Sequence, residues 1–367
     1  GPETIGALYG SGALLLQSNS LTVKNAADSV FGGSISGSGS VLETGSSSLT
    51  LTGANTFTGG LFLNSGSTGS GVRIGNNAAL GTGTLTLLRG MLSSDSATAR
   101  TLANAVVIAG TNVITLGDST NSGTLTFNGN VSLSTSATLS TLSSVIMSGV
   151  ISGSNALVKN DLGSLLLSGS NAFSGPVSIN GGTLTISGGF ALPDSGTLAI
   201  ASGAFVKLNA SENIGALSGA GAVLLQTNTL TVLGVADNTF SGVLSGSGNL
   251  VLNGSSNFTL SGANTYAGAT IVSGGSLSLG ASNVLPDSTA LTISGSTLAL
   301  GAFSDTVASV SLVNNGQITG TGTLNAVGTI MISAGSVSAN LTGIESGAAY
   351  KTIKAASWYK NPGEGVV

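Results

Sequence analysis

The chain has 367 residues, including 58 glycines and 5 prolines, and it contains no cysteine and no histidine. Only 6% of its residues are charged while 41% are hydrophobic, the formal net charge is −4, and the mean hydropathy is +0.47. This apolar, weakly charged composition excludes an intrinsically disordered chain, the lack of a Gly-X-Y period excludes collagen, and the lack of a run of about 18 apolar residues excludes a transmembrane helix.

Short segments of alternating apolar and polar residues, closed by glycine, recur along the chain. Alternation with a period of two is typical of strands that bury one face, and no stretch shows a sustained helical period. In chain order, the clearest segments are Leu14 to Val23, Gly83 to Leu88, Gly123 to Phe127, Gly182 to Ser187 and Ser276 to Leu279. The sequence therefore predicts an all-β protein.

Two long stretches of the chain are near copies of each other. Residues 5–59 align without a gap onto residues 214–268, an offset of 209, and 32 of the 55 aligned positions are identical. A gapless match over this span indicates that whole turns of structure were duplicated, as in solenoids, in which each unit packs mainly on its neighbours. The repeated sequence covers residues 5–67, 147–187 and 214–280.

The strongest block occurs three times: LTLTGANTFTGG from Leu49, LLLSGSNAFSGP from Leu165 and FTLSGANTYAGA from Phe258. Each copy carries a leucine, an asparagine, an aromatic residue and a glycine at fixed spacing. These signature residues are Leu51, Asn55, Phe57 and Gly59; Leu167, Asn171, Phe173 and Gly175; and Leu260, Asn264, Tyr266 and Gly268. We expect all twelve to have structural roles.

Residue chemistry suggests what each position does. Leu49 and Leu51 are expected to fill an interior while Thr50 and Thr52 face water, and Gly53 is expected to turn the chain with a positive φ. We interpret the asparagine as a turn residue in the left-handed region whose amide bonds from coil to coil, rather than as a catalytic group. The aromatic residue is interpreted as core packing at a corner, with a ligand platform as the alternative.

These features predict a right-handed parallel β-helix, a rod-like β-solenoid. Coils of about 20 to 25 residues would give roughly 15 to 18 coils in the chain. A sandwich or an ordinary barrel fits the length and regularity less well.

The pattern L-x-L-[ST]-G-[AS]-N-[TA]-[FY]-x-G, followed by a strand such as SINGGTLTIS (178–187) or IVSGGSLSLG (271–280), resembles the autotransporter-associated β-strand repeat. The resemblance implies a parallel β-helix in the passenger region of a Gram-negative autotransporter. It also implies a secreted or cell-surface location, with membrane attachment through a separate C-terminal barrel. It carries over no catalytic residue.

The ends of the chain differ from the repeats. Gly1-Pro2 resembles a protease-cleavage scar, and residues 3–347 are expected to be a solenoid fragment of a longer protein, because neither a signal peptide nor the amphipathic strands of a membrane barrel are recognisable. The composition changes near residue 348. We interpret residues 348–367, which contain Lys351, Lys354, Lys360 and Trp358, as a cap, a linker or the start of a next domain, with an anchor as the remaining alternative.

The sequence gives little support for catalysis or for a bound cofactor. Without histidine and cysteine, Ser-His-Asp, Cys-His and ordinary zinc sites cannot form, and a pI of about 4.6 without a basic stripe argues against nucleic-acid binding. A lyase of the pectate-lyase type would need clustered carboxylates. The candidate acids are Asp28, Asp237, Asp194 and Asp287, which we interpret as turn residues. We therefore expect no enzyme activity, no cofactor and no metal.

The functional prediction is a structural or interaction module of a bacterial surface protein, an adhesin stalk or self-associating rod acting in adhesion, aggregation or biofilm formation. Its partners would be itself, or a host or matrix glycan or protein. Two alternatives remain: a polysaccharide-acting enzyme, and an ice-binding threonine array. The array would use five Thr-Leu-Thr triplets, at Thr50/Thr52, Thr84/Thr86, Thr124/Thr126, Thr183/Thr185 and Thr229/Thr231, whose spacings of 34, 40, 59 and 46 residues do not match one coil length.

Overall fold

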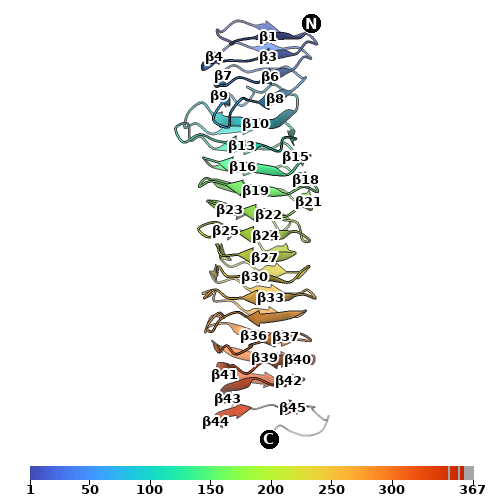
Figure 1. Ribbon diagram of the computed structural model, residues 1–367, viewed down its shortest axis with the longest axis vertical. Helices are drawn as coiled ribbons and strands as arrows, with labels where there is room; N and C mark the ends of the chain where they lie inside the picture. The colour runs from blue at the N-terminus through green and yellow to red at the C-terminus, as the bar shows by residue number, and fades with distance from the viewer. Residues whose placement is uncertain (346–347, 354–355, 359–367) are drawn as a thin grey trace. The chain divides into compact units, whose positions relative to one another are not determined.

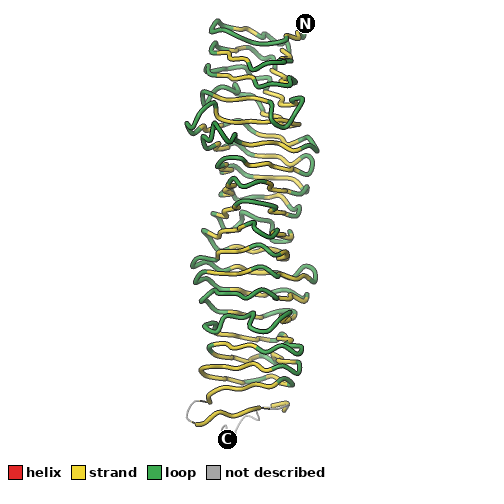
Figure 2. The backbone as a smooth tube through the Cα atoms, turned by 60° about the vertical axis from the view of Figure 1, so that its left-hand side comes forward, coloured by secondary structure: helices red, strands yellow, loops and turns green. Residues whose placement is uncertain are grey.

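The computed structural model describes residues 1–345, 348–353 and 356–358, with side chains to residue 343. Two compact units are present, Gly1–Pro193 and Asp194–Val367. Within the described residues every regular element is a β-strand (Figures 1 and 2), so no helix there is long and apolar enough to cross a membrane. The predicted all-β class is confirmed.

Unit 1 winds through three parallel sheets. Its first sheet consists of β1 (Glu3–Ile5), β3 (Leu21–Val23), β6 (Val41–Glu43), β8 (Leu61–Asn64), the first half of β10 (Leu85–Ser94), β12 (Val106–Ile108), β15 (Val131–Leu133), β18 (Ile151–Gly153) and β21 (Ala172–Phe173). Its second sheet consists of β4 (Ser29–Phe31), β7 (Leu49–Leu51), β9 (Gly71–Ile74), the second half of β10, β13 (Val113–Leu116), β16 (Ala137–Thr141), β19 (Leu157–Asn160) and β22 (Val177–Ile179). Its third sheet consists of β11 (Arg100–Leu102), β14 (Leu125–Phe127), β17 (Val145–Met147), β20 (Ser164–Leu167) and β23 (Thr183–Ile186), and β2 (Leu14–Leu15) pairs separately with β5 (Ile35–Ser36).

Unit 2 repeats this plan. Its first sheet consists of β26 (Glu212–Ile214), β29 (Leu230–Val232), β32 (Leu250–Leu252), β34 (Thr270–Val272), β36 (Ala290–Ser294), β39 (Ser309–Val313) and the second half of β41 (Thr323–Ile332). Its second sheet consists of β24 (Thr197–Ile200), β27 (Ala216–Gly219), β30 (Asn238–Phe240), β33 (Asn257–Leu260), β35 (Ser276–Leu279), β37 (Thr297–Ala299), β40 (Gly316–Thr319) and β42 (Gly335–Val337). The third sheet consists of β25 (Phe205–Leu208), β28 (Ala222–Leu224) and β31 (Val243–Ser245), and β38 (Asp305–Val307) pairs with the first half of β41, which continues to β43 (Asn340–Glu345).

Strand register fixes the length of one turn. In the first sheet of unit 1, Leu21 pairs with Val41 and Val41 pairs with Leu61, so the two turns are equal in length. The next two steps, from Leu61 to Leu85 and from Leu85 to Val106, are slightly longer. All four turns lie in the predicted range of about 20 to 25 residues, and the predicted parallel β-solenoid is confirmed.

The core is a column of aliphatic side chains inside each unit. A typical three-residue strand buries its first and third residues and leaves the middle one half-exposed, as in Leu49-Thr50-Leu51, because successive side chains of a strand point to opposite faces. Leu49 and Leu51 are 0% exposed. Leucine inside and threonine outside is the arrangement that the sequence predicts for this block.

Gly53 differs from its predicted role as a positive-φ turn residue. Its φ is not positive, and a glycine is needed at this position for a different reason. A Cβ atom there would lie 1.9 Å from the carbonyl oxygen of Gly33 in the preceding turn. Glycine is used here because the backbones of successive turns approach too closely for any side chain.

The parallel stacking ends near the C-terminus. β44 (Ala348–Ile353) pairs antiparallel with β43, and β45 (Ala356–Trp358) pairs antiparallel with β42. This change of direction falls where the composition changes. Residues 354–355 and 359–367 of the predicted cap or linker lie outside the described residues, and its role stays a prediction.

Candidate functional site

The asparagine of the repeat block joins three successive turns. Asn55 Oδ1 accepts a hydrogen bond from the backbone N–H of Ile35 at 2.7 Å, one turn before it. Its Nδ2 donates to the backbone carbonyl of Ala79 at 2.6 Å, one turn after it. Asn55 is 2% exposed, so both backbone groups would otherwise be buried without a partner.

The other two copies make the same pair of bonds. Asn171 accepts from Ile151 N at 2.7 Å and donates to Ala191 O at 2.8 Å. Asn264 accepts from Leu244 N and donates to Val284 O, each at 2.8 Å. None of the three asparagines has a positive φ. The expected left-handed turn conformation is therefore not found, and the amides bond to backbone groups rather than to one another.

The remaining signature residues pack in the interior or against the backbone. Leu51, Leu167 and Leu260 are 0% exposed, as are Phe57 and Tyr266, and Phe173 is 2% exposed. This burial agrees with core packing and leaves the aromatic rings no accessible face for a ligand. At Gly59, Gly175 and Gly268 a Cβ atom would approach backbone atoms of the preceding turn to between 2.1 and 2.5 Å.

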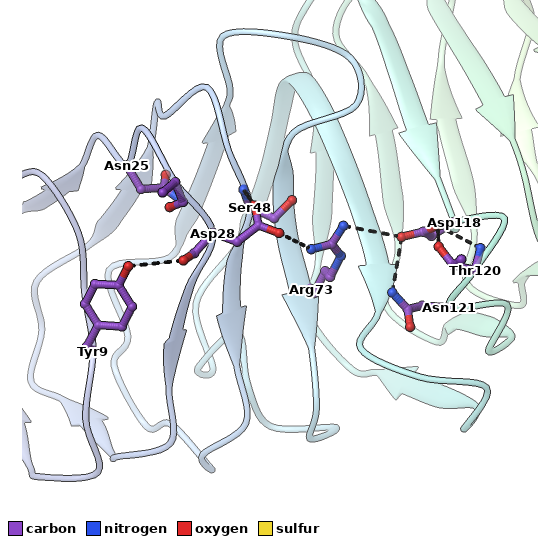
Figure 3. Close-up of polar contacts among 9 residues, drawn as sticks. Tyr9, Asn25, Asp28, Ser48, Arg73, Asp118, Thr120 and Asn121 are labelled. Carbon is purple, nitrogen blue, oxygen red and sulfur yellow. Dashed lines mark hydrogen bonds and ion pairs between the residues drawn. The ribbon is translucent and has the colours of Figure 1, made fainter.

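A cluster of charged residues that the sequence analysis did not identify lies on unit 1 (Figure 3). Arg73, on β9, donates from Nη1 to Asp28 Oδ2 at 3.0 Å, and its Nη2 lies 3.5 Å from Asp118 Oδ2. Asp118 also accepts hydrogen bonds from Thr120 and Asn121. The arginine thus bridges carboxylates of separate turns, near the level of β9 to β13 where the loops of Figure 1 widen.

Both carboxylates of this cluster are held in the ionised form. The hydrogen bond from the Ser48 backbone, with the nearby Arg73, lowers the pKa of Asp28 although partial burial opposes it. Burial works to raise the pKa of Asp118, but the hydrogen bonds from Thr120 and Asn121 and the charge of Arg73 outweigh it, so that pKa is lowered. The Asp28 side chain is 62% exposed. Its contacts therefore hold neighbouring turns together at the surface, and its carboxylate is not a proton donor.

The four candidate acids lie in loops and turns of their own units. Asp28 Oδ1 accepts from Ser48 N at 2.8 Å, and its duplicate Asp237 accepts from Asn257 N at 2.7 Å, so both cap the next turn of their own unit. Asp194 and Asp287 are exposed. In the described residues no three acidic groups gather as a metal site.

Besides Glu212, which begins β26, three further ionisable side chains are buried where the alternation of strands predicts an aliphatic residue. Lys159 donates from Nζ to the carbonyls of Asp161 and Gly181, and burial lowers its pKa to about 8. Asp305 accepts from the N–H groups of Val284 and Leu285. The third is Glu43, at the end of β6. An ionisable residue at an inward position is the signal that could have identified them.

A groove of about 320 Å³ on unit 1 is lined by residues that include Asn77, Thr82, Thr101 and Asn104. One atom of each of its two asparagine amides is already hydrogen-bonded to the backbone. Asn77 Oδ1 accepts from Thr101 N, and Asn104 Nδ2 donates to the carbonyls of Gly81 and Gly83. The lining contains no ionisable residue. The groove therefore offers shape but no group for acid–base chemistry.

The Thr-Leu-Thr triplets do not form one array. They belong to β7 of the second sheet, β10 of the first, β14 and β23 of the third, and β29 of unit 2. Only β14 and β23 share a sheet, and β17 and β20 lie between them, where the outward residues are Ile146 and Leu166. A continuous threonine surface of the ice-binding kind is not present in the described residues.

The middle outward positions of the first sheet carry no charge in either unit, and the exposed and half-exposed charged residues of this sheet in unit 1, Glu3 of β1 and Arg89 beside Asn64, lie outside these positions. In unit 1, its middle positions run through the paired residues Thr22, Leu42, Phe62, Thr86, Val107, Ser132 and Ser152. In unit 2 they run through Asn213, Thr231, Val251, Ile271, Thr292, Ser311 and Met331. The offset of 209 places Thr22, Leu42 and Phe62 on Thr231, Val251 and Ile271, so the duplication preserves this uncharged column.

Parallel sheets wound into turns of nearly constant length, with an asparagine that bonds both neighbouring turns, define a parallel β-solenoid repeat protein. Three segments, residues 44–67, 157–186 and 250–279, match the family model described as passenger-associated-transport-repeat. Each segment contains one signature block. The chain therefore carries an autotransporter passenger repeat, which implies a secreted or surface-displayed protein. No significant match was found among curated proteins or solved structures.

Proposed function

We propose that this chain is part of a passenger anchored at the outer membrane of a Gram-negative bacterium, and that it mediates adhesion by associating with further copies of itself. It acts without catalysis and without a cofactor. The contact surface is the outward face of the first sheet. The observation that carries this proposal is the uncharged column that the duplication preserves.

The column combines two properties that favour association. Leu42 and Phe62 in unit 1, and Val251 and Ile271 in unit 2, are half-exposed, so contact with another surface would remove apolar area from water. Charged residues are missing from these middle positions, so copies that bring two such columns together meet no electrostatic repulsion between them. Hydroxyl groups of Thr22 and its neighbours complete the face with groups that hydrogen-bond in either direction.

Display on non-adherent bacteria tests the proposal. Cells carrying the chain should settle faster than cells without it, and Phe62→Lys combined with Ile271→Lys should abolish the effect by placing one cation in each column. Ser178→Lys combined with Thr259→Lys is the matched control, because these residues face outward from the second sheet of each unit. The control cells should settle like wild type.

Ligand binding is scored in the same experiment with a panel of glycans and matrix proteins. If the cells bound one ligand class without clumping, the proposed function would change from self-association to adhesion to a host surface. Loss of clumping in both double variants would mean that added charge alone acts, and would refute the assignment to the first sheet. If the cells showed neither clumping nor ligand binding, the chain would be a passive spacer.

A further inference from the structure

A carboxyl group faces the dry interior of unit 1. Glu43 ends β6, follows the inward residue Val41 by two positions, and is 0% exposed. It pairs in register with Val23 before it and Leu63 after it. In the duplicated copy this position is Leu252, which pairs with Val232 and Val272. The fold therefore accepts an aliphatic side chain here, and the glutamate is a specific feature of the first copy.

Glu43 and a second polar side chain, Asn25, both lie against Gly45. Glu43 Oε1 accepts a hydrogen bond from Gly45 N at 2.8 Å. Asn25, 1% exposed, places its Oδ1 atom 1.9 Å from the position that a Cβ atom of Gly45 would occupy. In this orientation of the amide, Asn25 Nδ2 donates to Ala27 O at 3.4 Å. Asn25 Oδ1 and Glu43 Oε2 are both buried and, within the described residues, both lack a hydrogen-bond partner.

Asn25 and Glu43 are both present in the first copy and both absent from the second. The offset of 209 places Gly234 opposite Asn25 and Leu252 opposite Glu43, so the second copy has neither the amide nor the acid. Gly45 is matched by Gly254, where a Cβ atom would lie 1.8 Å from the backbone carbonyl oxygen of Leu233 in the preceding turn. A buried polar group whose partner is removed is costly, and the joint change is what a direct bond between the two side chains predicts.

Two acceptors cannot bond to each other unless one carries a proton. An amide oxygen never donates, and an ionised carboxylate only accepts, whereas a protonated carboxyl has one O–H to donate. We propose that Glu43 is protonated in the folded chain and donates from Oε2 to Asn25 Oδ1, so that this interior corner is a binding site for one proton. The bond satisfies both unpartnered atoms at once.

The surroundings supply no charge that would hold Glu43 ionised. The strands packed around it, β3, β8, β4 and β7, contain no other ionisable residue, and neither do the turns that follow β6 and β8. In the turn after β3, Lys24 and Asp28 are exposed, and Asp28 is paired with Arg73. Burial accordingly raises the pKa of Glu43 to about 7, although the hydrogen bond from Gly45 opposes the shift.

The proton makes the first turns of unit 1 sensitive to pH. The pKa of Glu43 is higher in the folded chain than its ordinary value of 4.5, so the stabilisation is complete below pH 4.5 and is lost as the pH rises through about 7. Each pH unit in this window changes the local opening equilibrium tenfold, about 300-fold in all. At neutral pH and above, the turns around β6 should open more readily than the same turns of the second copy.

Carboxyl titration in the intact chain tests the proposal directly. The sequence contains five glutamates, so selective ¹³C labelling of the glutamate carboxyl carbon gives few signals, and the signal missing in Glu43→Gln identifies Glu43. This signal should titrate near pH 7. Titration of this signal near 4.5, which would mean an ionised carboxylate with another partner such as a bound cation, would overturn the proposal. If no glutamate carboxyl titrated near pH 7, the proposal would be overturned without the use of any variant.

Urea unfolding at pH 5 and pH 8, followed by hydrogen exchange in residues 21–51, provides the second measurement. Wild type should open more readily at pH 8, while Glu43→Gln, which keeps a donor and cannot ionise, should lose this pH dependence. The double variant Asn25→Gly, Glu43→Leu reproduces the second copy and should also be insensitive. The surface variant Glu3→Gln is the control. An unchanged pH dependence in Glu43→Gln would refute the assignment.

Discussion

Replacing Asn55 by leucine, which has a similar size, tests how the turns are held together. The change removes the acceptor for Ile35 N–H and the donor to Ala79 C=O, and leaves both backbone groups buried. Each unsatisfied buried group costs about 1 to 3 kcal/mol, so we expect a loss of about 2 to 6 kcal/mol in the free energy of unfolding. The same substitution at Asn264 should cost less, because Val284 C=O keeps the hydrogen bond from the backbone N–H of residue 264 at 3.2 Å when the side-chain amide is lost.

Hydrogen exchange measures this loss locally. The Ile35 amide should lose protection in Asn55→Leu, and the Leu244 amide should lose it in Asn264→Leu, while each variant leaves the other copy protected. Asn64→Leu, at an exposed asparagine, is the control and should change neither amide. If Asn55→Leu lowered stability by less than about 1 kcal/mol, the asparagine would not be the bond between turns that its contacts indicate.

Three further substitutions examine the interior, the backbone contacts and the charged cluster. Leu51→Asp should lower the free energy of unfolding in urea by more than about 4 kcal/mol, because it buries an unpaired charge. Thr50→Ser should change this free energy by less than about 0.5 kcal/mol. If Leu51→Asp also changed it by less than about 0.5 kcal/mol, the assignment of the inward and outward faces of β7 would be wrong. Gly175→Ala should cost about 1 to 3 kcal/mol, because its Cβ atom would lie 2.1 Å from a backbone oxygen of the preceding turn, while Gly188→Ala, where the nearest atom is 3.4 Å away, is the control that should stay near wild type. Arg73→Ala should cost less than about 1 kcal/mol, and high salt should reduce the difference, because the ion pair with Asp28 is partly exposed; a cost that salt does not change would indicate packing rather than charge.

The strand pattern was predictable because it depends on alternation alone. Ser276 to Leu279 is a strand with the bounds that the sequence predicts, and the predicted segment at Gly182 to Ser187 contains β23 (Thr183–Ile186). Leu51 and Phe57 are buried as expected. These predictions succeed because the side-chain direction in a strand follows directly from sequence position.

Contacts between turns could not be predicted in the same way. The role of Asn55 depends on which backbone groups of neighbouring turns face its amide, and the register that decides this is set by loops of variable length. Arg73 lies 45 residues from Asp28 in the chain, and the loops between β9 and β13 bring Asp118 to the same arginine. Single residues give no signal of such distant pairs. Glu43 did leave a signal, since it occupies an inward position, and comparison with Leu252 makes that signal clear.

The asparagine bonds also bear on how the solenoid grows during folding. An asparagine such as Asn171 needs the turn before it for one bond and the turn after it for the other. While turns are added in sequence, a turn that carries one of the three signature asparagines has an incomplete amide until the next turn forms, and it frays more easily until then. The following turn completes the amide at Asn55, Asn171 and Asn264. Growth past each of these three points is then harder to reverse without any external energy source, because reopening the turn of the asparagine requires breaking bonds on both of its sides.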